Sequence, residues 1–186
     1  VRNCDSPKWL KNRLEAIGLR PINALVDVTN YLTYDLNRPL HVFDYDKINK
    51  GLEIRKAKAG EKILALDDKE YELSRSHTIF SDDNHPESIA GIIGGKRTGC
   101  DYDTVNVLVE SATWDKINIA NTGRELNINS DARYRNERGI DNEFNDSGLD
   151  KAVEMIKEIC GGEISNTKSV GKPVNRQEKI NFNLDE

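Results

Sequence analysis

The sequence predicts an α+β domain, in which a mixed, largely antiparallel, barrel-like sheet is flanked by helices. Two helical stretches open the chain, a run of short alternating segments fills its middle, and helical periodicity returns near its end. Consecutive strands at short spacing favour antiparallel pairing, whereas a doubly wound fold alternates strands with helices. With 186 residues, the chain is long enough for one domain with a buried core.

Apolar residues at helical spacing predict the first two elements. The first stretch lies between Pro7 and Gly18 and predicts a helix over about 7–17. A second stretch follows Pro21 and ends before Pro39. Its apolar side consists of Leu25, Val28, Leu32 and Leu36.

The apolar period changes to two after Leu52, which indicates strands. Residues 63–66 and 71–73 flank an Asp-Asp-Lys turn and predict a hairpin. Further strands are expected at 78–81, 88–93 and 105–112, followed by helices over about 115–123 and 148–159.

Charge and hydropathy limit the classes of partner. Hydrophobic residues make up 37%, mean hydropathy is -0.68, and no apolar run approaches the roughly 18 residues of a membrane span, so no membrane partner is expected. A net charge of -5 argues against a surface that is basic throughout. A local basic patch remains as either an RNA contact or a solvated helix face; it comprises Lys8, Lys11, Arg13 and Arg20.

The cysteines and the chain ends indicate a cytoplasmic segment of a longer protein. Cys4, Cys100 and Cys160 are odd in number and far apart, which favours a reducing cytoplasm over a disulfide framework or a zinc site. Because the sole methionine is internal and position one is a valine, we expect an excised segment. Residues 1–165 are then one domain, and 166–186, with little periodicity, are a linker toward an absent domain.

Two polar groups in apolar surroundings are candidate functional residues. Asp27, Thr29 and Asn30 lie on or beside one face of the second helix, where a solvated face is the alternative. His41 lies among apolar neighbours after Pro39 and is expected on a loop. It could orient a substrate or a water there, or be a core histidine bonded to backbone.

Small residues at 89–95 indicate either a binding wall or a tight bend, because glycine weakens a strand unless something must approach closely. Ala90 and Gly91 belong to this segment. A phosphate-binding loop is excluded, since Ala90 replaces its first glycine, Arg97 replaces its Ser/Thr and no helix is expected to follow.

Glu110 closes an apolar strand on the face opposite Val107 and Val109. Its carboxylate is either exposed at a sheet edge, or paired with another group of the protein, or in contact with a hydroxyl or amine of a substrate. His41, His77 and His85 lack metal-ligand spacing, and no Ser-His-Asp or Cys-His order has nucleophile context, so neither metal hydrolysis nor covalent catalysis is predicted.

Several motifs together resemble the editing module of the bacterial phenylalanyl-tRNA synthetase beta subunit, its third and fourth domains. They occur in the family's order and spacing at 20–23, 26–31, 38–44, 90–95, 109–112, 130–135 and 137–141. The resemblance implies a cis-acting hydrolase for tyrosine wrongly attached to the phenylalanine tRNA. A non-catalytic structural or RNA-contacting module of the same synthetase is the alternative, and a free-standing deacylase or RNA-binding protein is a further one.

The resemblance also implies roles for individual residues. Thr29, Asn30 and His41 surround the scissile ester and position the attacking water, while Glu110 accepts a hydrogen bond from the para-hydroxyl of tyrosine. The pocket and its edge are formed by Ala90, Gly91, Ser130, Ala132, Arg20 and Pro39.

Implied partners are the aminoacylated 3′ end of tRNA, the synthetase alpha subunit and the remaining beta-subunit domains of a heterotetramer. No cofactor is expected in this domain, since ATP and Mg serve the parent enzyme. The chain departs from the family pattern at Arg38, Ser130, Arg133 and Asn136. Ser130 keeps the hydroxyl of the usual threonine, whereas Arg133 and Asn136 are expected to alter the neighbouring surface.

Overall fold

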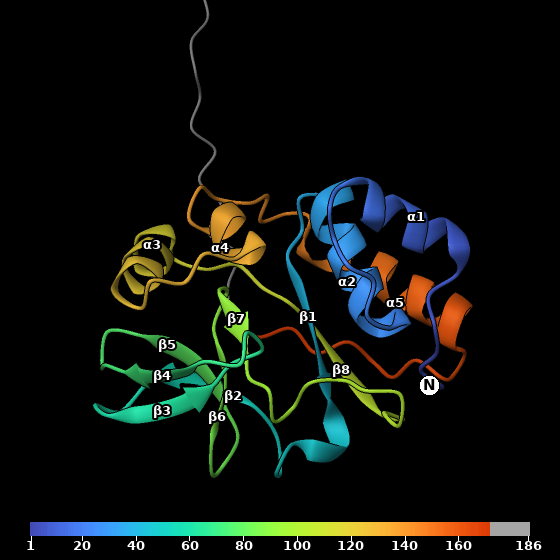
Figure 1. The fold of residues 1–186 in the computed structure, drawn as a ribbon. Helices are drawn as coiled ribbons and strands as arrows, with labels where there is room; N and C mark the ends of the chain where they lie inside the picture. Colours follow the sequence, from blue (N-terminus) through green and yellow to red (C-terminus); the bar gives the residue numbers. More distant parts are fainter. Residues whose placement is uncertain (172–186) are drawn as a thin grey trace, which may run out of the picture.

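A two-stranded ribbon separates a group of helices from a group of short strands in the computed structural model, which describes residues 1–171 (Figure 1). Helices α1, α2 and α5 lie on one side of the ribbon, and strands β2 to β7 lie on the other. Two further helices, α3 and α4, lie on the strand side.

Three helices form the first core: α1 (Lys8–Ala16), α2 (Ala24–Asp35) and α5 (Asn145–Cys160). Their predicted apolar faces are confirmed, because Leu10, Leu25 and Val28 are fully buried in one cluster. All three cysteines of the chain are free, as expected. None of the helices within residues 1–171 is both long and apolar enough to span a bilayer.

The ribbon consists of β1 (Leu40–Asp44) and β8 (Val107–Ser111), paired antiparallel. Strand β1 was not predicted, and it continues into a short 3₁₀ turn, η1 (Tyr45–Lys47). Val107 and Val109 pack against the helical core, while Leu108 packs against Phe43 on the opposite side. The predicted alternation along β8 is therefore confirmed.

The remaining strands form a four-stranded sheet and a hairpin. The sheet, in the order β2-β5-β6-β7, contains β2 (Glu53–Lys56), β5 (Thr78–Ser81), β6 (Pro86–Ile89) and β7 (Ile93–Gly94). The predicted hairpin is confirmed as β3 (Glu61–Leu64) and β4 (Glu70–Leu73), and the bridge between Ala65 and Gly95 joins it to the end of β7. Every strand pair within the described residues is antiparallel, and the strands form three sheets that do not close into a barrel.

Helices α3 (Lys116–Glu125) and α4 (Asp131–Asn136) complete the strand side. The first was predicted; the second was not, because its six residues carry no apolar periodicity. Residues 166–171 of the predicted linker are exposed and have no helix or strand, and its remaining part, 172–186, lies outside the described residues.

Candidate functional site

His41 and Glu110 face each other across the ribbon. The register of β1 and β8 places His41 directly opposite Glu110, so both side chains lie on the Phe43 and Leu108 side of the ribbon, away from the helices. His41 therefore lies on a strand and not on the predicted loop. Pairing with a strand nearly seventy residues later makes this segment extended, which local sequence does not reveal.

His41 is half-buried, and its imidazole lies against Phe43 and Gly94. Its ring meets the ring of Phe43 edge-on, with 4.3 Å between centroids, and Gly94 lies so close that any Cβ there would collide with the imidazole. Nε2 is buried without a hydrogen-bond partner. Burial lowers the pKa of His41 to about 4, so the imidazole is neutral at neutral pH.

Desolvation has the opposite consequence at Glu110, which is half-buried, as is His41. Among the described residues no hydrogen bond or ion pair engages its carboxyl group, and burial raises its pKa to about 8. Burial disfavours the charged form of either group, so at neutral pH the cross-strand pair holds a neutral imidazole and a mostly protonated carboxyl. Opposite pKa displacements in adjacent groups are typical of functional sites.

A series of aromatic contacts begins at Phe43, beside His41. The centroids of Phe43 and Phe80 lie 5.8 Å apart, those of Phe80 and Trp114 lie 5.6 Å apart, and Ala90 completes the cluster. Sequence reasoning missed the aromatic residues, although they are scarce: Phe, Trp and Tyr make up only 6% of the chain.

The glycine-rich segment forms a tight bend between β6 and β7. Gly91 has φ +69°, and a Cβ added there would lie 2.5 Å from Cδ1 of Trp114. The bend also brings Ala90 into the aromatic cluster, so it bounds the site as well.

Helix α4 is hydrogen-bonded to this bend at both ends. The Ser130 hydroxyl accepts a bond from the Arg133 N–H and donates to the Ile92 carbonyl at 2.6 Å. At the other end, Nδ2 of Asn136 donates to the Gly91 carbonyl at 2.9 Å. The buried Asn136 is thus part of the scaffold of the site and not of the neighbouring surface. Ala132 lies half-buried on the same helix.

Arg133, the other departure expected at the surface, also lies against protein. Its Nη1 donates to the Ile128 carbonyl at 2.6 Å, and its Nε donates to Glu137 at 3.0 Å. The side chain covers Gly123 of α3 so closely that a Cβ there would collide with it.

The polar residues of α2 form a second group. The buried Thr29 hydroxyl donates to the Val26 carbonyl at 2.8 Å, whereas Asn30 is partly exposed. No hydrogen bond among the described residues joins either side chain to His41 or Glu110. Asp27 is not on a solvated face, because it is fully buried and accepts bonds from the Ser6 hydroxyl and the Ile22 N–H.

The two predicted edge residues lie at element boundaries. Arg20 is exposed between α1 and α2, and Pro39 is buried directly before β1. The neighbouring Arg38 is also buried, and its guanidinium donates to Asn145 Oδ1 at 2.5 Å and to the Asp141 carbonyl. This departure from the family pattern therefore anchors the segment that leads into α5.

Two surface hollows of the described chain lie away from the cross-strand pair. They have volumes of about 290 Å³ and 320 Å³; one lies beside β3 and β6, and the other lies between the N-terminal segment and the end of α5. Close to the pair, Trp114 lies against Gly91 and His41 lies against Gly94.

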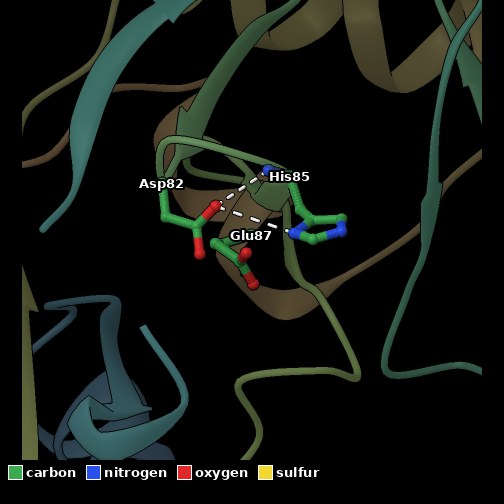
Figure 2. Close-up of side chains that lie close together, drawn as sticks. All are labelled: Asp82, His85 and Glu87. Atoms are coloured by element: carbon green, nitrogen blue, oxygen red, sulfur yellow. Dashed lines mark hydrogen bonds and ion pairs between the residues drawn. The ribbon is translucent and has the colours of Figure 1, made fainter. Parts of the chain in front are cut away.

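A possible metal-ligand cluster lies away from this site, in the turn between β5 and β6. Asp82, His85 and Glu87 bring ligand atoms within 4.8 Å of one another (Figure 2). The guanidinium of Arg97, however, pairs with both carboxylates. Although burial opposes it, backbone N–H donors and the Arg97 charge lower the pKa of Asp82 to about 2. The residues fit an ion-pair cluster better than a metal site.

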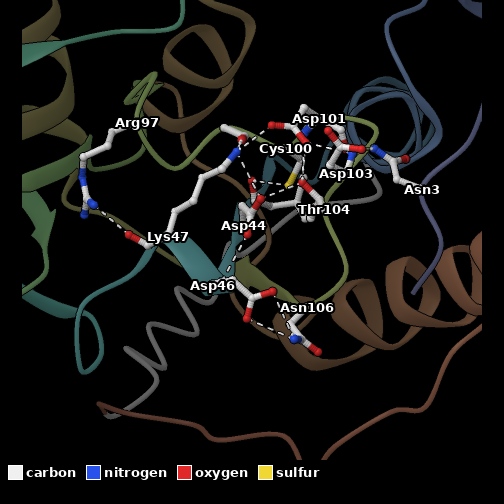
Figure 3. A network of polar contacts seen from close by, with 12 residues as sticks. Asn3, Asp44, Asp46, Lys47, Arg97, Cys100, Asp101, Asp103, Thr104 and Asn106 are labelled. Carbon is white, nitrogen blue, oxygen red and sulfur yellow. Dashed lines mark hydrogen bonds and ion pairs between the residues drawn. The ribbon is translucent and has the colours of Figure 1, made fainter.

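A separate polar network fixes the end of β1. Lys47 bridges Asp44 and Asp101, and the Thr104 hydroxyl donates to Asp44 at 2.7 Å (Figure 3). These bonds hold η1 against the loop that leads into β8, so they support the ribbon register that pairs His41 with Glu110.

Comparison with known proteins identifies the family. Residues 1–161 match the family described as the B3/4 domain. The chain belongs to the B3/4 domain family. This B3/4 domain is 57% identical over 171 residues to the phenylalanine–tRNA ligase beta subunit of Ruegeria pomeroyi, a match that covers 92% of the chain and 21% of that protein. It is 53% identical over all 186 residues to the beta subunit of Rhodopseudomonas palustris, covering 23% of it.

The B3/4 domain thus spans less than a quarter of the length of these curated relatives. An N-terminal fragment of the phenylalanyl-tRNA synthetase beta subunit from Pyrococcus horikoshii is 19% identical, with a TM-score of 0.40 over 46% of the chain and 32% of the fragment. That likeness is too low to support an argument about fold.

Proposed function

We propose that this B3/4 domain is the post-transfer editing domain of a phenylalanyl-tRNA synthetase beta subunit, which hydrolyses tyrosine misattached to the phenylalanine tRNA. The names of the relatives support the parent enzyme. The observation that carries the editing role is Glu110, a half-buried carboxyl group with a raised pKa that lies directly opposite His41, on the side of the ribbon that carries Phe43.

Such a carboxyl distinguishes tyrosine from phenylalanine by one hydrogen bond. A synthetic site shaped for phenylalanine rejects an added hydroxyl only weakly, so a second site must remove the product. The phenol of a bound tyrosine donates to Glu110, whereas phenylalanine leaves the carboxyl buried and unpaired. Leaving a desolvated carboxyl group without its hydrogen-bond partner costs about 1–3 kcal/mol, or roughly five- to a hundredfold in binding.

Hydrolysis by this site proceeds through orientation of water. His41 is neutral at neutral pH, so its ring nitrogens can accept and donate hydrogen bonds to a water at the ester. On α2, the Thr29 hydroxyl uses its proton on Val26 and keeps oxygen lone pairs that can accept from a water, and Asn30 offers its amide. The terminal ribose of the tRNA assists the activation of that water.

The remaining residues shape the pocket. Ala90, Gly91, Ser130 and Ala132 form the wall that the ring enters, with Arg20 and Pro39 at the edge. Ser130 contributes by holding the bend through Ile92.

The parent enzyme supplies the other activities and contacts. The parent enzyme carries out aminoacylation with ATP and Mg, and it contains the alpha subunit and the remaining beta-subunit domains. We expect this enzyme in the cytoplasm. The acidic chain supplies few phosphate contacts, so those neighbours hold most of the tRNA.

Deacylation of phenylalanine tRNA charged with tyrosine tests this proposal. The wild-type chain should release tyrosine, while His41→Ala and Glu110→Ala should each slow release at least tenfold. Glu72→Ala, which removes an exposed strand carboxylate, is the matched control and should leave the rate unchanged. Wild-type rates in both active-site variants would contradict the roles assigned.

A structural or RNA-contacting module of the same synthetase is the second candidate, because neither of the two surface hollows includes the cross-strand pair. This candidate predicts that the wild-type chain binds tRNA but does not deacylate it at any RNA concentration, including within the whole synthetase.

A further inference from the structure

The outward face of α2 carries aromatic side chains. Tyr31 and Tyr34 are spaced i and i+3, so they are neighbours on one side of the helix; Tyr34 is exposed, and Tyr31 is partly buried against the helical core. Each tyrosine contacts an arginine from a different helix. This face is therefore continued by side chains of α1 and α4.

On the α1 side, three side chains form a stacked group. The rings of Trp9 and Tyr31 meet edge-on, with 5.7 Å between centroids, and the Arg13 guanidinium lies within 5.7 Å of both. Arg13 also donates to the Tyr31 hydroxyl at 2.6 Å, which fixes the group. Trp9 nevertheless remains 44% exposed, although the burial of a tryptophan stabilises a fold strongly.

On the α4 side, the Arg135 guanidinium lies 4.4 Å from the centroid of Tyr34, which is 37% exposed. A second pair joins Tyr134 of α4 to Arg138, which follows the helix; the guanidinium lies 3.7 Å from the centroid of the Tyr134 ring, and Tyr134 is 55% exposed. Because the same helix is bonded to the bend at Gly91, this surface borders the proposed editing site.

Local charge adds to the aromatic character. Residues 8–20 contain four basic side chains and one acidic side chain, and residues 131–138 contain three and two, in a chain whose net charge is -5. Exposed aromatic rings among arginines match the faces of nucleic-acid bases and the phosphates between them, as in proteins that bind single strands.

We propose that Trp9, Arg13, Tyr31, Tyr34 and Arg135 form a stacking surface that binds the single-stranded 3′ end of an RNA, with the Tyr134 and Arg138 pair at its border. The bases stack on the exposed rings, and the arginines contact the phosphates. The inference rests on the proposed function, because it takes the RNA end that leads to the ester. The proposal gives the basic residues of α1 a role in binding RNA. They would have no such role if they formed only a solvated helix face.

The test uses an uncharged RNA hairpin with a short single-stranded 3′ overhang, the same hairpin with a blunt end, and the full chain. Fluorescence anisotropy at low salt should show tighter binding of the overhang. Tyr34→Ala and Trp9→Ala should each weaken binding of the overhang about tenfold, within the range for loss of one stacked base. Tyr34→Phe should retain binding, because it keeps the ring.

Tyr45→Ala is the matched control, since Tyr45 is 48% exposed on η1, outside this surface. Circular dichroism confirms that each variant folds. The inference is overturned if the wild-type chain binds no RNA, if blunt and overhanging hairpins bind equally, or if both alanine variants match the wild type. The probe carries no ester, so it reports on binding alone. If the chain binds the overhang but does not deacylate charged tRNA, only the editing proposal is contradicted. If the chain deacylates charged tRNA and neither Tyr34→Ala nor Trp9→Ala changes the rate, only the stacking surface is contradicted.

Discussion

Two side chains on adjacent strands have pKa values displaced in opposite directions by one cause. Burial lowers the pKa of His41 to about 4 and raises that of Glu110 to about 8. Sequence alone identified both residues as unusual, because each is polar among apolar neighbours. Their pairing could not be predicted from local pattern, since it depends on the register of strands far apart in the chain.

The pH dependence of stability should reveal the proton on Glu110. In the folded chain the pKa of Glu110 is about 8, whereas the unfolded chain releases this proton near the ordinary glutamate pKa of 4.5. Between these values the folded state binds more protons, so the free energy of unfolding falls as pH rises, by up to about 1.4 kcal/mol per pH unit.

Glu110→Gln removes this dependence and leaves His41 in place. Urea unfolding of both proteins between about pH 5 and pH 8 should show the wild type losing stability relative to the variant as pH rises. A difference that stays constant over this range would show that the carboxyl group is not buried in the folded chain.

Gly94 should be essential because of the imidazole beside it. Its backbone suits any residue, but a Cβ there collides with His41. We expect Gly94→Ala to displace the imidazole and reduce deacylation at least tenfold, with a loss of stability of about 1–3 kcal/mol from overpacking. Gly60→Ala is unsuitable as a control because Gly60 has positive φ. The control is Ala120→Gly, which changes a partly buried residue of α3, away from His41. Full activity in Gly94→Ala would contradict the placement of His41.

At the scale of elements, strong periodicity gave reliable predictions. The helices at α1, α2, α3 and α5 and the β3–β4 hairpin were predicted within a few residues, because their apolar side chains repeat over several turns or about a clear turn sequence. Strand β1 and helix α4 were missed, since five and six residues carry too little pattern. Both depend on distant partners: β8 for β1, and the Gly91 bend for α4.

Helix α4 should depend on the Ser130 hydroxyl. Ser130→Ala removes both the cap of α4 and the bond to the Ile92 carbonyl, so unfolding should become easier by about 1–2 kcal/mol. Deacylation should fall as well, because the bend that bounds the site loses its support. Ser130→Thr keeps the hydroxyl and should retain both properties. Thermal unfolding together with the deacylation assay measures them, and equal stability of the two variants would contradict this role.

At the scale of the whole molecule, the ribbon of β1 and β8 joins two cores. One side packs on the helices and the other on the aromatic cluster, so the proposed site lies where the two halves of the domain meet. The α+β class followed from the order of elements along the sequence, but the separation into three small sheets did not, because strand pairing across the chain is not encoded in local alternation.

The ratio of deacylation rates for tyrosine and phenylalanine on the same tRNA tests the central claim most directly. The ratio of kcat/KM values should be high for the wild-type chain and should fall roughly five- to a hundredfold in Glu110→Ala, chiefly through slower release of tyrosine. Glu72→Ala should keep the wild-type ratio. If Glu110→Ala keeps the wild-type preference for tyrosine, Glu110 does not recognise the hydroxyl and the proposed basis of editing is wrong.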